Sequence, residues 1–219
     1  MKTKIMMMAV AICVTASSYA QIGRPSFGIR AGVNFQNLNG KDADDDRLEN
    51  KLMVGLNAGV NAEVPIAQDF YVQPGLLYSV KGAKAENDFG GDDVKFKLNY
   101  IELPINLLYK PALGEGRLLM GFGPYIAYAL NGKVKAGDDD FDIEFDNEVA
   151  PIDLIDGPVM KRFDAGANLL FGFEMSNNLS AQLNAQLGLL NLNPKVTGNN
   201  QDLGTLKNTG FGVSVGYRF

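Results

Sequence analysis

The sequence contains no histidine, and its single cysteine is Cys13. Without histidine, Ser-His-Asp and Cys-His arrangements cannot form, and the most frequent general base is missing. A lone cysteine excludes an internal disulfide. After residue 20, no uninterrupted apolar run approaches the ~18 residues that a membrane-spanning helix requires. No pair of carboxylates stands beside a nucleophile either, so we expect no catalytic residues, no cofactor and no enzymatic activity.

The N-terminal segment has the layout of a secretory signal peptide. Two lysines precede an apolar run, and Ser18 and Ala20 then supply the small residues of a cleavage site. We therefore predict a cleaved signal peptide over residues 1–20 and a single domain over residues 21–219. Cleavage removes Cys13, which leaves a mature chain without cysteine.

The chain has fewer basic than acidic residues, 20 against 25. Removing the two lysines of the predicted signal peptide leaves 18 basic residues and a net charge of −7. Because nucleic acids require a basic binding face, we expect no nucleic-acid partner.

The feature that is present throughout is a two-residue alternation. In the last twelve residues, apolar side chains occupy every second position, at Phe211, Val213, Val215, Tyr217 and Phe219, with glycine, serine or arginine between them. Side chains on a strand point alternately to opposite faces. The segment therefore predicts a strand with one apolar face and one small or polar face.

This alternation recurs in eight segments. They span approximately residues 26–38, 51–65, 69–84, 95–110, 116–132, 161–174, 178–191 and 208–219. Each is longer than the ~9–11 residues with which a tilted strand crosses a bilayer. Since lipid touches one face of a membrane barrel and the lumen the other, we predict an all-β fold, an eight-stranded antiparallel up-and-down transmembrane β-barrel. The alternative is a soluble barrel with an apolar interior, and the absence of charge from the apolar face favours lipid outside.

The expected connections alternate in length. Those at residues 66–68, 111–115 and 175–177 are short, whereas those at 39–50, 85–94, 133–160 and 192–207 are long. Outer-membrane barrels have short periplasmic turns and long external loops. Every short turn falls on the side of both termini, so we predict an outer-membrane location with the N- and C-termini in the periplasm.

Acidic residues concentrate in the long connections, which hold 19 of the 25. The run from Asp42 to Asp46 has acids but lacks the glycine and the terminal glutamate of an EF-hand loop. We therefore favour solvated acidic loops over a dedicated metal site. Weak divalent binding, or bridging to lipopolysaccharide through divalent cations, is the alternative.

Several charged residues have the parity of the polar face and are expected in the lumen. They are Arg30, Glu63, Glu102, Arg117, Asp164, Glu174 and Arg218. An unpaired buried ion is costly, and eight strands enclose a space that side chains can fill. We predict a stabilising plug in which Arg30 pairs with Glu63 or Glu102. A gate or narrow path through the same charges is the alternative.

The C-terminal residues Val215, Tyr217 and Phe219 share one face of the last strand. They resemble the C-terminal signal of outer-membrane proteins, which implies recognition by the barrel assembly machinery during insertion. The simpler interpretation is an aromatic anchor at the membrane interface.

Residues 99–110, N-Y-I-E-L-P-I-N-L-L-Y-K, contain Y-x-E-x-P followed by tyrosine and lysine. Further motifs are R-A-G-V-N-F at 30–35, P-G-L-L-Y-S at 74–79, G-F-G-P-Y at 121–125 and F-D-A-G-A-N at 163–168. Together they resemble the PorT-type outer-membrane β-barrel family of the Bacteroidota over almost the whole mature chain. One member of that family is associated with type IX secretion, and barrel enzymes of the outer membrane resemble one another in using a histidine base.

The resemblance and the residue pattern together predict a structural or interaction protein with a closed or nearly closed lumen and acidic external loops. Its expected partners are outer-membrane lipid and lipopolysaccharide, and a protein in a larger complex such as a secretion system. The alternative is a narrow, porin-like channel for small solutes.

Overall fold

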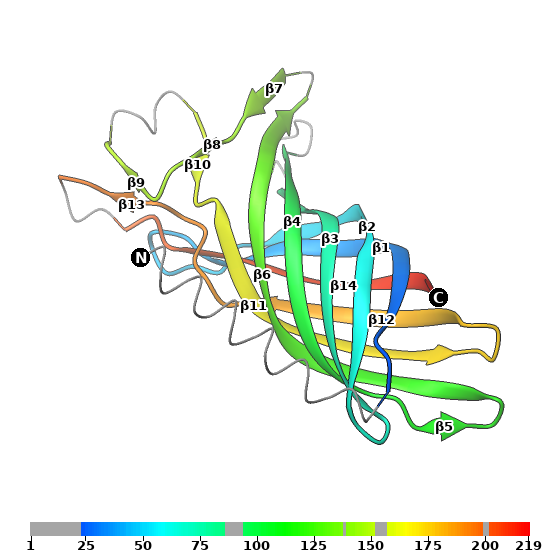
Figure 1. Ribbon diagram of the computed structural model, residues 1–219. Helices are drawn as coiled ribbons and strands as arrows, with labels where there is room; N and C mark the ends of the chain where they lie inside the picture. Colours follow the sequence, from blue (N-terminus) through cyan, green and yellow to red (C-terminus); the bar gives the residue numbers. More distant parts are fainter. Residues whose placement is uncertain (1–22, 86–93, 138, 152–156, 199–201) are drawn as a thin grey trace.

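The computed structural model describes residues 23–85, 94–137, 139–151, 157–198 and 202–219 (Figure 1). Its strands are β1 Ser26–Lys41, β2 Asn50–Ala67, β3 Phe70–Ala85, β4 Val94–Tyr109, β5 Ala112–Leu113, β6 Gly116–Ala136, β7 Asp139–Asp142, β8 Glu144–Phe145, β9 Glu148–Val149, β10 Val159–Met160, β11 Phe163–Glu174, β12 Leu179–Gly188, β13 Lys195–Val196 and β14 Thr205–Arg218. None of the described segments is a helix long and apolar enough to cross a membrane. The expected signal peptide, with Cys13, lies outside the described residues and stays a prediction.

Eight long strands form a closed antiparallel ring in the order β1, β2, β3, β4, β6, β11, β12 and β14. The ring closes because β14 pairs with β1 from Gly28 opposite Arg218 to Lys41 opposite Thr205. Closure satisfies the backbone groups that an open sheet would leave at its edges. The predicted eight-stranded antiparallel barrel is confirmed.

The two faces of the ring differ as the alternation predicted. On the outer face, Leu56 and Val215 are each 63% exposed, whereas their inward neighbours Asn57 and Ser214 are buried. The outer face carries most of the exposed large apolar side chains, and the inner face carries the buried amides, hydroxyls and charges. This arrangement is opposite to that of a soluble barrel with an apolar interior. The apolar face is therefore the one available to lipid.

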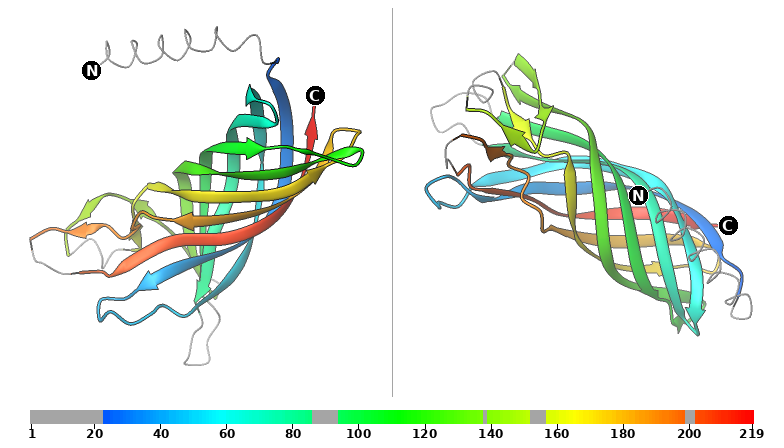
Figure 2. Two further views of the ribbon diagram at one scale, coloured as in Figure 1. Left: turned by 90° about the horizontal axis from the view of Figure 1, so that it is seen from below. Right: turned by 60° about the vertical axis from the view of Figure 1, so that its left-hand side comes forward.

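The two ends of the ring also differ (Figures 1 and 2). The short-turn end carries the two-residue turn between β2 and β3, the β5 hairpin and the turn between β11 and β12. Asp69 and Asn178 adopt positive φ there, a conformation that short polar side chains tolerate. Both described chain ends lie at this end, where the Phe219 amide donates to the Phe27 carbonyl at 2.8 Å. The long-loop end carries β7 to β10 and β13.

Several strands run past their predicted limits at the long-loop end. β6 continues to Ala136, which lies opposite Val94 of β4, and β14 begins at Thr205. These extensions pair through the backbone but alternate lysine, asparagine and threonine on their outer face. Because their outer residues are polar, an apolar alternation does not reveal them.

Candidate functional site

The lumen contains two separate networks of charged side chains. At the short-turn end, Glu63 accepts from Lys110 at 2.7 Å and from Arg218 at 2.5 Å. Lys110 also contacts Glu174 at 2.9 Å, and Gln73 donates to Glu63 at 3.2 Å. We call these residues the turn-end network. Its two cations balance its two carboxylates, as buried ions require.

The second network, the loop-end network, is centred on Lys81 of β3, whose side chain is completely buried. The Lys81 ammonium lies 2.9 Å from a carboxylate oxygen of Glu102 on β4 and 3.4 Å from one of Asp164 on β11. Asp164 also accepts from the Tyr125 hydroxyl at 3.2 Å and from the Asn208 amide at 2.9 Å. The Lys81 ammonium lies 4.3 Å from the centre of the Tyr125 ring, within cation–π range. Five strands of the ring, β3, β4, β6, β11 and β14, are thus joined by this network.

Between the two networks the lumen is lined by amides, hydroxyls and Arg30. The Asn34 amide donates to the Ser79 hydroxyl at 3.2 Å, and Asn57 donates to Asn34. A cavity of about 20 Å³ lies among these residues, which is the scale of a single water molecule. Side chains therefore fill the middle of the barrel.

Glu63 and Glu102 lie in the two networks, but neither forms the ion pair with Arg30 that the sequence predicted. Glu63 contacts Lys110 and Arg218, and Glu102 contacts Lys81. Arg30 instead donates to Asn184 at 3.2 Å and forms no ion pair with any residue that the structure describes. Arg30 lies opposite Gly59 of β2, four residues before Glu63, whereas Lys110 and Arg218 contact that carboxylate at the turn end.

The other charged residues expected in the lumen fall into two groups. Asp164, Glu174 and Arg218 belong to the networks. Arg117 lies exposed at the rim, where its guanidinium donates to the Tyr71 hydroxyl at 3.1 Å. Arg117 has lumen parity but is the second residue of strand β6, where the ring opens to solvent.

Sequence reasoning missed Lys81 and Lys110. Lys81 shares the inward parity of Ser79, but Leu77 and Ala83 have that parity too, so β3 does not show a clean polar face. Lys110 follows the last residue of β4, and it ends the predicted strand at 95–110 with the same parity as Glu102, so the alternation itself was a signal that could have placed it in the lumen. Charge balance was a further signal, since the four carboxylates predicted in the lumen outnumber the three arginines predicted there.

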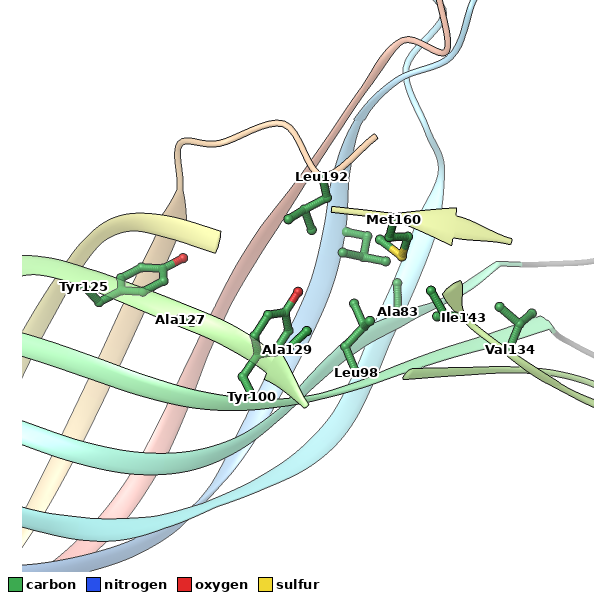
Figure 3. Close-up of a cluster of buried hydrophobic side chains, with 11 residues drawn as sticks. Ala83, Leu98, Tyr100, Tyr125, Ala127, Ala129, Val134, Ile143, Met160 and Leu192 are labelled. Carbon is green, nitrogen blue, oxygen red and sulfur yellow. The ribbon is translucent and has the colours of Figure 1, made fainter. Parts of the chain in front are cut away.

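An apolar cluster closes the lumen above the loop-end network (Figure 3). Ile143, Met160 and Leu192 come from the long connections and are buried against the tops of the strands. Backbone hydrogen bonds hold them: the Ile143 amide donates to Gly132 at 2.9 Å, and the Leu192 amide donates to Leu206 at 2.7 Å. We call Ile143, Met160 and Leu192 the apolar cap.

The connections that carry the cap are themselves paired. β8 runs parallel to β10, and β9 runs parallel to β13. The Lys161 amide donates to the Leu192 carbonyl at 2.7 Å, and its ammonium donates to Asn191 at 3.3 Å. Partial burial, together with the nearby charge of Lys195, lowers the pKa of Lys161. Residues far apart in sequence therefore make one folded layer over the mouth.

The acidic residues of the described loops are exposed. Asp42 caps its own turn, since its carboxylate accepts from the backbone amides of Asp44 and Asp46, each at 2.9 Å. Within the described ranges, no group of three or more acidic side chains is arranged to hold a metal ion. The acids of residues 86–93, 138 and 152–156 lie outside these ranges.

The C-terminal residues Val215, Tyr217 and Phe219 lie on the outer face, and Phe219 is 70% exposed. The rings of Tyr217 and Phe219 contact each other edge to face, with centroids 5.2 Å apart. Both rings are available at the membrane surface. Their role as an assembly signal stays a prediction.

A family model described as "outer membrane protein beta-barrel domain" matches residues 18–193. The chain belongs to this family. It is accordingly a barrel of the outer membrane, surrounded by lipid and lipopolysaccharide, and proteins of such families are in general not enzymes. No curated protein matches the sequence.

Solved structures of other outer-membrane proteins are similar to this chain. OprG from Pseudomonas aeruginosa is 15% identical, with a TM-score of 0.51 over 89% of this chain and 95% of OprG. Neisserial surface protein A is 12% identical, with a TM-score of 0.48 over 90% of this chain and all of that one. Ail of Yersinia pestis, solved with the heparin analogue sucrose octasulfate, is 13% identical, with a TM-score of 0.43 over 90% and 100%. These similarities concern the fold alone.

Proposed function

We propose that this protein is a closed barrel whose role is structural or interactive, and that it presents its acidic long-loop end outside the cell. The observation that carries the proposal is the filled lumen. The turn-end network, the packed middle and the loop-end network with its apolar cap block the axis at successive heights. A solute path would have to displace all of them.

The cost of opening supports closure as the resting state. Removing one partner of a buried ion pair costs about 3–5 kcal/mol, and the Lys81 side chain has no exposed surface. The cap adds the cost of exposing buried apolar side chains. Thermal opening of both barriers together is therefore rare.

The proposed orientation of the barrel in the membrane rests on the difference between the two ends of the ring. The short turns and both described chain ends lie together, as in barrels whose termini are periplasmic. The folded layer of long connections then faces outward. Its ordered strands and exposed acids suit contact with a protein in a larger outer-membrane complex, in agreement with the resemblance to the PorT-type family.

A narrow channel is the second candidate, and one observation favours it. Several buried oxygens in the lumen have no hydrogen-bond partner among the described residues, including those of Asn57, Asn106 and Gln182. Such atoms are usually satisfied by water. A chain of water molecules could then connect the middle of the lumen to one of its ends.

Single-channel recording of the full chain in planar bilayers separates the two candidates. The closed barrel gives no discrete conductance steps. Lys81→Met removes the central cation of the loop-end network and is expected to produce leak, while Lys84→Met, on the outer face of the same strand, does not. Steps in the unmodified protein whose ion selectivity changes in Glu102→Gln would establish the channel instead.

The interaction role needs a separate test. Intact cells are cross-linked, the outer membrane is solubilised gently and a tagged copy is purified. A stoichiometric protein partner supports the accessory role, and a partner lost after deletion of residues 139–149 places the contact at the long-loop end. A clean monomer contradicts the complex.

A further inference from the structure

The outer face of the barrel carries a row of lysines at its long-loop end. Lys84 of β3 lies opposite Lys95 of β4, and Lys95 lies opposite Lys135 of β6. Two residues further along β4, toward the apolar part of the outer face, Lys97 lies opposite Lys133. These five residues form what we call the lysine patch, and Lys51 of β2 extends it, since it lies opposite Lys84.

Like charges directly opposite each other on neighbouring strands destabilise a sheet. The patch contains three such pairs among its five residues. The acidic residues near the patch neutralise its charge only weakly. Asp140 of β7 lies 3.9 Å from both Lys133 and Lys135, and all three side chains are exposed. Lys84, Lys95 and Lys97 form no ion pair with the residues that the structure describes. A patch of this kind fits an external anion.

The patch lies where the apolar outer band ends. On β4 the outward residues toward the short-turn end are Ile101, Leu103 and Ile105. On β6 they include Ile126 and Tyr128. Lysines next to an apolar band place their stems along it and their ammonium groups at the level of lipid headgroups.

The patch occupies only one side of the ring. At the long-loop end of the opposite side, β1 and β14 present Asn37 opposite Thr209 and Asn39 opposite Lys207. Solubility alone does not require such an uneven distribution, because the polar residues of β1 and β14 serve that purpose without clustered charge. The asymmetry indicates a site on β3, β4 and β6.

We propose that the lysine patch binds the phosphate groups of an anionic glycolipid in the outer leaflet, with the acyl chains along the apolar band below. The proposal rests on the outward orientation of the long-loop end given above. Lysine ammonium groups are compact point charges suited to phosphate. Asp140 and Asp142 of β7, each 3.9 Å from Lys133, compete with the lipid for the same lysines.

The test measures binding of diphosphorylated lipid A to the full chain in phosphatidylcholine nanodiscs. The patch variant is Lys95→Gln/Lys135→Gln. The matched control is Lys41→Gln/Lys207→Gln, which removes the same charge at the same end of the opposite side. The patch variant is expected to weaken binding by about tenfold or more, because each lysine near an anionic lipid contributes roughly fivefold. The control is expected to change affinity less than about twofold.

A second variant is expected to change lipid A affinity in the opposite direction. Asp140→Asn/Asp142→Asn removes the competing carboxylates and is expected to tighten lipid A binding several-fold. Lipid A without phosphates is expected to bind the unmodified protein and the patch variant equally.

Three results overturn the proposal: equal weakening in the patch and control variants, no dependence on the lipid phosphates, or equal affinity for phosphatidylglycerol in the unmodified protein. The last result means a general anionic surface rather than a glycolipid site. Failure of the closed-barrel proposal is recognised separately, because the patch lies outside the lumen and its variants leave bilayer conductance unchanged.

Discussion

The two charged networks of the lumen use different means to bury ions. The turn-end network has two cations, Lys110 and Arg218, for two carboxylates, and lies near the rim, where Arg218 and Glu174 retain slight exposure. The loop-end network has one central cation, Lys81, for Glu102 and Asp164, and is sealed beneath the apolar cap. The Tyr125 hydroxyl and the Asn208 amide supply further hydrogen bonds to Asp164. The loop-end network therefore depends on one cation, whereas the turn-end network has duplicated contacts.

We expect the largest effect on stability from Lys81→Met. The change keeps an unbranched side chain but removes the ammonium group, which leaves Glu102 and Asp164 buried without their common cation. We expect a loss of about 3–5 kcal/mol in the free energy of unfolding, measured by urea titration of the barrel refolded in lipid. Lys84→Met is the matched control and is expected within about 0.5 kcal/mol of the unmodified protein. Equal losses in the two variants would show that Lys81 is not central.

The corresponding change in the turn-end network is Lys110→Met. Glu63 keeps Arg218 and Gln73, and Glu174 can reach water at the rim, so we expect a smaller loss of about 1–3 kcal/mol. The same urea titration measures it. A loss larger than that of Lys81→Met contradicts the idea that duplicated contacts protect this network.

The smallest expected effect concerns a neutral donor. Tyr125→Phe removes the hydroxyl that donates to Asp164 while Asn208 and Lys81 remain. We expect a loss of about 1.5 kcal/mol, at the lower end for hydrogen bonds to charged groups. Tyr128→Phe, on the outer face of the same strand, is the control. If the two changes have equal effects, the neutral donors contribute little to the loop-end network.

The sequence was sufficient for the barrel and its sidedness, because alternation reports directly which face each residue takes. It also placed Glu63 and Glu102 in the lumen. It was insufficient for the partners of Glu63, since its pairing with Arg218 depends on the stagger of strands far apart in the chain. Lys81 was obscured by the apolar inward residues of β3.

The apolar cap and the lysine patch are two further features that the sequence alone does not reveal. Ile143, Met160 and Leu192 are separated by connections without periodicity, so nothing in their spacing brings them together. Lys95 and Lys135 alternate visibly on their own strands, but their opposition is a matter of register. In both cases the missing information is which residues of neighbouring or distant segments share a height along the barrel.

The most direct test of the closed lumen uses a thiol in its middle. Ser79→Cys places it on the inner face of β3, in a chain whose natural cysteine, Cys13, lies in the predicted signal peptide. A small charged thiol reagent is applied to the folded barrel in lipid, with Asp45→Cys as the exposed control. The closed lumen predicts that Ser79→Cys reacts only after unfolding in urea, and reaction of the folded barrel at the rate of the control would contradict it.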